Sequence, residues 1–180
     1  EQRIRAISFK SERINIEKII DQLVRLEKLD TLVLVKEKKT KFPKKLGDLI
    51  NLKKLIIRAN ELNEIPEFVV NLKKLEYFDG SENEFSDLPS QFNQLENLKT
   101  LILDKNHFMK FPQSLKDLIQ LEKLSFKDNK LIEIPEWISN LQDLRTLLLN
   151  GNEINSFPLS FTELKNLTKI KMNKNPMKFL

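Results

Sequence analysis

The chain has 180 residues, of which 31 are lysine or arginine and 26 are aspartate or glutamate, so its formal net charge is +5. That length fits one domain or one small repeat array, and 40% apolar residues are typical of a folded chain. The absence of cysteine, the single histidine (His107) and the three glycines exclude disulfides, thiolate metal sites, paired imidazoles and glycine-rich phosphate loops. We therefore expect no enzyme activity and no cofactor. We also expect no membrane-spanning helix, because no apolar run of about 18 residues occurs.

Residues 1–25 predict an N-terminal cap made of a strand and a helix. The segment RIRAISF is typical of a strand, and apolar residues at helical spacing follow in SERINIEKIIDQLVRL. The residues at helical spacing are Ile16, Ile19, Ile20, Leu23 and Val24. Because neither segment shares the pattern that begins at Leu26, we expect them to cover the first unit of that pattern.

From Leu26 onward the chain repeats with a period of 23 residues. Prolines mark this period at Pro43, Pro66, Pro89, Pro112, Pro135 and Pro158. Asparagines recur with the same spacing at Asn60, Asn83, Asn106, Asn129, Asn152 and Asn175. A fixed period of roughly 20 to 50 residues indicates stacked structural repeats. Residues 26–180 are therefore predicted to form seven units, of which the last is incomplete.

Each unit predicts a strand, a turn and a short helical segment. Leu101 and Leu103 alternate with Ile102 and Asp104, which is the period of a strand, and stacked strands would form a parallel sheet. An asparagine amide both donates and accepts, so it can satisfy the backbone of the turn. Proline fixes φ and suits the first position of a short helical turn. Gly80 replaces a strand leucine, so we expect a packing defect or a close backbone approach there.

The unit LKTLILDKNHFMKFPQSLKDLIQ, residues 98–120, resembles the leucine-rich repeat family in its 23-residue class, which includes bacterial and spirochaete proteins. The resemblance covers residues 26–180. It implies an α/β fold: a curved, right-handed solenoid with a parallel sheet on its concave face and short helical or 3₁₀ outer limbs. It also implies that the recurring asparagines form a structural ladder. The implied function is a non-enzymatic module for protein–protein interaction that recognises its partner through the concave face.

Outward strand positions of such a solenoid would line the concave face. The candidate partner-binding residues are Val33, Val35, Lys54, Ile56, Arg58, Tyr77, Asp79, Glu82, Ile102, Asp104, Lys123, Lys127, Leu148, Lys169 and Lys171. Several are apolar on a face that nothing in the chain covers, which favours an interaction surface. The alternative is that these β-branched residues serve only strand propensity. Tyr77, beside Arg58, Asp79 and Glu82, is the predicted hot spot because tyrosine and arginine often anchor interfaces.

Charge on these outward positions is arranged in zones, basic toward both ends and acidic near the third unit. The basic residues are Lys36, Lys54, Arg58, Lys105, Lys123, Lys127, Lys169, Lys171 and Lys174, and the acidic ones are Asp79, Glu82, Asp104 and Asp128. Nine positive and four negative charges leave +5, which equals the formal charge of the chain. The interrupted basic stripe and the single tyrosine disfavour nucleic acid, whereas an acidic protein or glycan partner is favoured.

Two alternatives to a free-standing interaction module remain open. The chain could be the substrate-recognition part of a larger secreted effector such as a ubiquitin ligase, or a surface or exported adhesin that binds host components. No C-terminal cap precedes Leu180, so the chain could continue, or its last edge could make a contact between molecules. The composition is compatible with a bacterial protein that is either cytoplasmic or exported.

Overall fold

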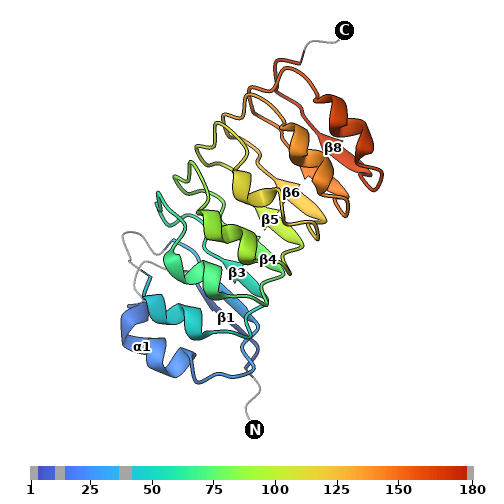
Figure 1. Ribbon diagram of the computed structural model, residues 1–180. Coiled ribbons are helices and arrows are strands. Elements are labelled where there is room, and N and C mark those ends of the chain that lie inside the picture. Colours follow the sequence, from blue (N-terminus) through green and yellow to red (C-terminus); the bar gives the residue numbers. More distant parts are fainter. Residues whose placement is uncertain (1–3, 11–14, 37–41, 178–180) are drawn as a thin grey trace.

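The computed structural model describes residues 4–10, 15–36 and 42–177, and its strands form one parallel sheet. The sheet contains eight strands in chain order from β1 to β8. Their bounds are β1 (Ala6–Phe9), β2 (Thr31–Leu34), β3 (Lys54–Ile56), β4 (Tyr77–Asp79), β5 (Thr100–Ile102), β6 (Lys123–Ser125), β7 (Thr146–Leu148) and β8 (Lys169–Lys171). Figure 1 shows the strands stacked along the molecule, with β1 and β8 at opposite ends of the stack. The predicted parallel sheet of an α/β solenoid is confirmed.

Strand register follows the 23-residue period without a slip. From β2 to β8, the two members of every residue pair between neighbouring strands are 23 positions apart, as Leu101 and Leu124 are. The side chains of both leucines are fully buried. Because neighbouring residues of a strand point to opposite faces, this register gathers the leucines on the inner face and leaves the variable residues on the other.

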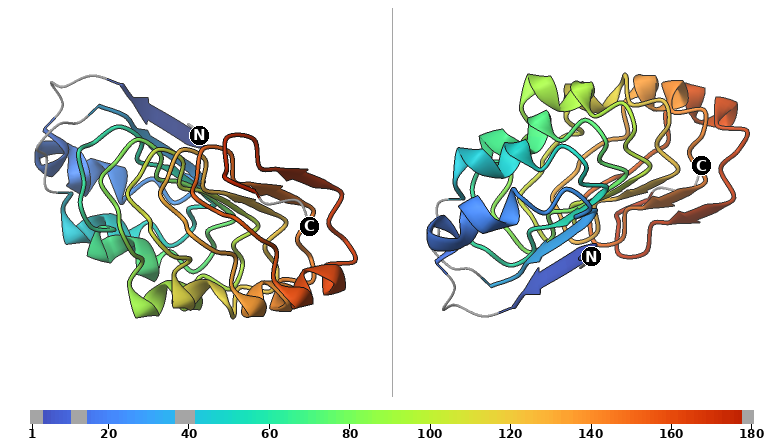
Figure 2. Two further views of the ribbon diagram at one scale, coloured as in Figure 1. Left: turned by 90° about the horizontal axis from the view of Figure 1, so that it is seen from above. Right: turned by 90° about the horizontal axis from the view of Figure 1, so that it is seen from below.

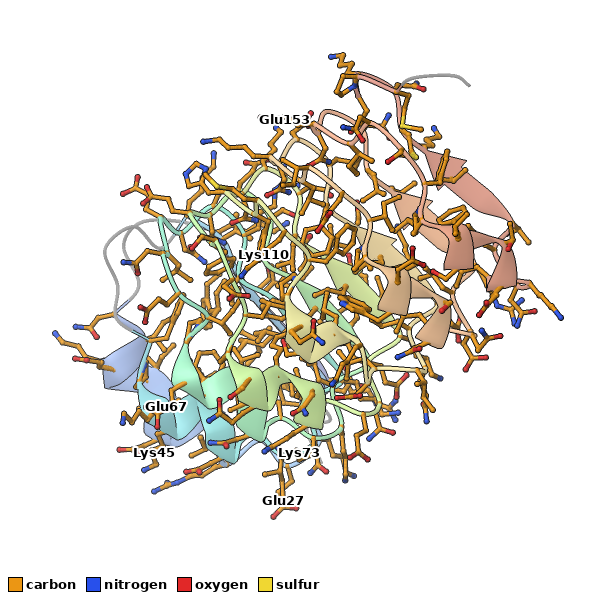
Figure 3. All side chains as sticks on the ribbon, turned by 45° about the horizontal axis from the view of Figure 1, so that its top comes forward. Glu27, Lys45, Glu67, Lys73, Lys110 and Glu153 are labelled. Atoms are coloured by element: carbon orange, nitrogen blue, oxygen red, sulfur yellow. The ribbon has the colours of Figure 1, made fainter. Side chains whose placement is uncertain are left out.

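The outer limbs are short 3₁₀ helices that lie opposite the sheet. They are η1 (Lys44–Asp48), η2 (Glu67–Asn71), η3 (Ser90–Gln94), η4 (Gln113–Leu115), η5 (Glu136–Asn140) and η6 (Leu159–Glu163). Figure 2 shows these turns in a row along one side of the solenoid and the strands along the other. Charged side chains project from this helical side, among them Lys45 and Glu67, which Figure 3 labels on successive limbs.

Each repeating proline stands one residue before its 3₁₀ helix, not at the first helical position as predicted from the sequence. Pro66, for example, has φ −57° and extended ψ 134°, and its carbonyl accepts the N–H of Val69 at 3.0 Å. The fixed φ of proline suits this junction, and the missing N–H has no role there. The proline therefore sets the direction of the limb and closes its first turn through its carbonyl oxygen.

The N-terminal segments pack against the first repeat. β1 pairs with β2 in parallel, and helix α1 (Ile16–Leu23) buries the side chains of Ile16, Ile20 and Leu23 in the common core. Residues 1–3 and 11–14 of the predicted cap lie outside the described residues. The division at residue 25 stays a prediction, because the core runs continuously from α1 through the repeats.

The recurring asparagines connect successive turns through buried hydrogen bonds. Asn106 accepts the backbone N–H of Phe85 at 3.0 Å and donates to the carbonyls of Gly80 and Leu103, both at 3.1 Å. Asn83, Asn129, Asn152 and Asn175 form the equivalent contacts in their own turns. Asn60 donates to the carbonyl of Leu34. Such buried backbone groups would be costly to leave unpaired, so these amides stabilise the stack.

Aromatic side chains fill the space that the missing side chain of Gly80 leaves. A Cβ atom at Gly80 would lie 3.0 Å from ring atoms of both Phe78 and Phe85, and 3.2 Å from a methyl carbon of Leu103. Phe78 and Phe85 are fully buried. The third unit thus exchanges one strand leucine for larger rings nearby, and these rings occupy the space in which the sequence predicted a packing defect.

Candidate functional site

The candidate site is the outer surface of the sheet, which we call the open sheet face. It consists of the outward residues of β2 to β8 and of the residues that directly follow each strand. Ten candidates lie on the strands: Val33, Lys54, Ile56, Tyr77, Asp79, Ile102, Lys123, Leu148, Lys169 and Lys171. The others follow the ends of β2 to β6: Val35, Arg58, Glu82, Asp104 and Lys127. The structure thus brings the candidates onto one face, and their role in binding stays a prediction.

Apolar side chains form an interrupted row across this face. The row runs in register through Val33, Ile56, Asp79, Ile102, Ser125, Leu148 and Lys171. The valine, the two isoleucines and the leucine are half-buried, because neighbouring strands shield their flanks while their tips remain accessible. Half-exposed apolar groups in a fixed array can lose their remaining contact with water when a partner covers them.

Tyr77 lies in the adjacent row, where it contacts the side chain of Lys54. The ammonium nitrogen of Lys54 on β3 lies 4.5 Å from the centre of the tyrosine ring, which is a cation–π distance. Burial raises the pKa of the Tyr77 phenol, and the nearby charges of Asp79 and Asp104 raise it further. The phenol therefore stays neutral at physiological pH and can donate a hydrogen bond to a partner.

A hollow of about 340 Å³ opens on this face beside β4 and β5. It is lined by Arg58, Asp79, Ser81, Glu82, Ile102, Asp104, Lys105, Lys127 and Asp128. The lining contains three cationic and four anionic side chains, so its net charge is −1. The centre of the face is therefore acidic, although the chain as a whole is basic.

Ion pairs neutralise two of the acidic groups in the hollow. Glu82 accepts a hydrogen bond from Arg58 and lies 3.4 Å from the ammonium nitrogen of Lys105. The Arg58 hydrogen bond lowers the pKa of Glu82, and the same contact raises the pKa of Arg58. Asp104 pairs with the side chain of Lys127 at 2.9 Å and also accepts its backbone N–H at 2.9 Å.

Two serines that were not among the predicted site residues hold the acidic groups in place. Ser81 donates to one carboxylate oxygen of Asp79 through its N–H at 2.9 Å and its hydroxyl at 2.5 Å. Ser125 donates its hydroxyl to Asp104 at 2.5 Å. Both serines are almost fully buried on a face where other units carry larger side chains. In the sequence, the available signal for these contacts was a small serine at a face position near a carboxylate.

The end of the face at β8 differs from the centre. Lys169 and Lys171 are exposed, and neither forms an ion pair with any residue that the structure describes. Lys123 on β6 is half-buried. The predicted charge zones therefore differ in environment as well as in sign, because the acidic centre is recessed and the basic residues of β8 are exposed.

Among the described residues, no group of three or more histidine, cysteine, aspartate or glutamate side chains could hold a metal ion. None of the helices in the described ranges is both long enough and apolar enough to cross a bilayer.

Comparisons with known proteins point to one family. A family model described as a leucine-rich repeat region matches residues 44–130, and a second, for a single leucine-rich repeat, matches residues 120–141. No curated protein sequence matches significantly.

Solved structures with the same fold come from a plant and from bacteria. The leucine-rich repeat ectodomain of the Arabidopsis thaliana receptor kinase GASSHO1/SCHENGEN3, solved in complex with CASPARIAN STRIP INTEGRITY FACTOR 2, is 29% identical with a TM-score of 0.71. That match covers 86% of this chain but 19% of the ectodomain. Internalin C2 of Listeria monocytogenes has a TM-score of 0.83 at 23% identity, covering 98% of this chain and 74% of its own. A Leptospira interrogans leucine-rich repeat protein has a TM-score of 0.58 at 21% identity, covering 97% and 61%.

Proposed function

The chain belongs to the leucine-rich repeat family, and we propose that it is a non-enzymatic interaction module that binds a partner protein through the open sheet face. Leucine-rich repeat domains are in general protein-interaction modules. The observation that carries the proposal is the row of half-buried Val33, Ile56, Ile102 and Leu148, which no other segment of the described chain covers. The similarity to an ectodomain that was solved in complex with CASPARIAN STRIP INTEGRITY FACTOR 2 supports the same proposal.

The rigidity of the face supports binding by a preformed surface. Each strand is hydrogen-bonded to its neighbours, and the residues that follow the strands are fixed by ion pairs such as that of Lys127 with Asp104. A partner that meets such a surface orders few side chains, so little conformational entropy opposes binding. The mixed apolar and charged surface suits a protein partner, because apolar contacts supply affinity while charges set its orientation.

The proposal can be tested with binders selected on the folded protein. Displayed peptides of about 12 residues would be selected against the wild-type chain, and their affinities measured for the double variant Ile56→Asp with Tyr77→Asp. Introducing charge into the apolar row at Ile56 and into the adjacent row at Tyr77 should weaken binding by at least about tenfold, because buried charge without a partner is costly. Circular dichroism and thermal melting should remain close to those of the wild type, since both side chains project from the open sheet face and not into the leucine core.

The matched control is Ile119→Asp on the η4 limb, where the isoleucine is 58% exposed and lies away from the sheet. This variant should bind the selected peptides as the wild type does. Normal binding by a folded Ile56→Asp, Tyr77→Asp variant, or an equal loss in the Ile119→Asp control, would contradict binding through the open sheet face.

A further inference from the structure

We propose that the hollow beside β4 and β5 receives a cationic side chain of the partner protein, an arginine or a lysine, and that Asp79 is its counter-ion. This inference rests on the proposed function, because it names the chemistry that the open sheet face would recognise. It concerns a single pocket on that face, so it can be wrong while the face still binds a partner.

The environment of Asp79 is the first argument. Asp79 is only 9% exposed, and it lies between Ile56 on β3 and Ile102 on β5 in the same row. Ser81 supplies two hydrogen bonds, and both reach the same carboxylate oxygen. A carboxylate in such surroundings is costly unless a cation compensates it, and no side chain in the described ranges forms an ion pair with Asp79.

The neighbouring acidic groups have the cationic partners that Asp79 lacks among the described residues. Glu82 is paired with Arg58 and Lys105, and Asp104 is paired with Lys127. These pairs also occupy the cations that line the hollow. Arg58 attracts Asp79 only from a distance, because its guanidinium is bonded to Glu82. A cation in direct contact with Asp79 therefore has to come from outside the described part of the chain, and the net charge of −1 in the lining favours its entry.

The shape of the hollow suits a long side chain better than a metal ion. Ile102 offers an apolar wall for a methylene stem, while the recessed carboxylate of Asp79 lines the hollow and offers a charge for the head of the side chain. The volume of about 340 Å³ is at the lower end of ordinary ligand pockets. The described residues contain no group of carboxylates arranged to hold a metal.

The exposed lysines at the β8 end of the face predict a second charged group on the partner. Lys169 and Lys171 on β8 are exposed, and β8 is four strands from β4. With strands about 4.8 Å apart, this separation is roughly 19 Å. We therefore expect the partner to present a basic residue to the hollow and an acidic group about 19 Å away, toward β8.

The experiment uses the same selected peptides in a double-mutant cycle. Each enriched peptide would be measured by isothermal titration calorimetry on the wild-type chain and on Asp79→Asn, which keeps an oxygen that can accept the Ser81 bonds. The peptide's arginine would be replaced by citrulline, or its lysine by norleucine, to remove the charge. Each single change should weaken binding by at least about tenfold, and the combined change by little more than either alone. Asp117→Asn on the limb that follows η4 is the matched control and should bind normally.

The outcomes separate the two proposals. Peptides without a cationic residue, or equal effects of the peptide's charge on the wild type and on Asp79→Asn, would overturn the cation pocket. If such peptides still lose binding to the Ile56→Asp, Tyr77→Asp variant, the open sheet face remains the binding surface. A selection that yields no peptide dependent on either site would overturn both proposals.

Discussion

The buried asparagine ladder and the open sheet face lie at the same strands, yet they vary in opposite ways along the chain. At the ladder the same residue recurs in six consecutive turns from Asn60 to Asn175, each with equivalent backbone partners. On the open sheet face, one row changes from valine to aspartate to serine to lysine. The repeated residues satisfy backbone groups that every turn has in common, whereas the varied residues form contacts that belong to single units, such as that of Asp79 with the N–H of Ser81. Changes at the ladder should therefore alter stability, and changes on the face should alter binding.

The largest expected effect comes from breaking the ladder with Asn106→Leu. The buried N–H of Phe85 would lose its partner, and the carbonyls of Gly80 and Leu103 would each lose a donor. We expect the free energy of unfolding to fall by about 3 kcal/mol, measured by urea denaturation. Asn97→Leu is the control, because exposed Asn97 makes a single bond to the carbonyl of Lys73, so its loss should stay within about 0.5 kcal/mol. Equal losses would show that burial of the amide is not the cause.

A smaller effect is expected from restoring the missing leucine with Gly80→Leu. Its Cβ would already approach the rings of Phe78 and Phe85 to 3.0 Å, so the added side chain overpacks the core. Such changes typically cost about 1–3 kcal/mol, again measured by urea denaturation. Adding Phe78→Leu gives this unit the arrangement of Leu101, Leu103 and Phe108 and should recover most of the loss. A double variant no more stable than Gly80→Leu alone would contradict the account of ring compensation.

The sequence was sufficient for the fold because each of its signals is local and recurs with the same period. The strand leucines and Asn106 could be placed from spacing alone and the prolines to within one residue, and the family and the parallel sheet are confirmed. The candidate face followed from the alternation along each strand. The period does not encode which side chains meet across strands. Neither the contact of Lys54 with Tyr77 nor the two bonds from Ser81 to Asp79 was predicted, because both depend on side-chain rotamers in the folded sheet.

The residue between the open sheet face and the asparagine ladder in each turn should affect the free energy of unfolding by about 1 kcal/mol. The residue before each ladder position has positive φ, +58° at Ala59 and +70° at Gly151, a region that side chains with a Cβ disfavour. Gly151→Ala should therefore lower the free energy of unfolding by about 1 kcal/mol, and Ala59→Gly should raise it by about 0.5 kcal/mol. Chemical denaturation of both variants checks the pair. The signs of the two changes are the test. If glycine acted only through the entropy of the unfolded chain, Gly151→Ala would raise the free energy of unfolding and Ala59→Gly would lower it.

The smallest effect concerns charge on the open sheet face and disappears as the pH falls. Because Arg58 holds the pKa of Glu82 below its ordinary value, the pair stabilises the folded state above about pH 4.3, the usual pKa of glutamate. This contribution is lost as the pH falls through the lowered pKa of the folded protein. Both side chains are partly solvated, so the effect should be only about 0.5 kcal/mol and should shrink in about 0.5 M salt. Glu82→Gln should thus destabilise the protein near pH 7 but not near pH 2, whereas Glu84→Gln, exposed and unpaired among the described residues, should change neither. An equal loss of stability at both pH values would mean that Glu82 acts through packing and not through its charge. The open sheet face would then stabilise the fold, although its variation between repeats suggests a role in binding.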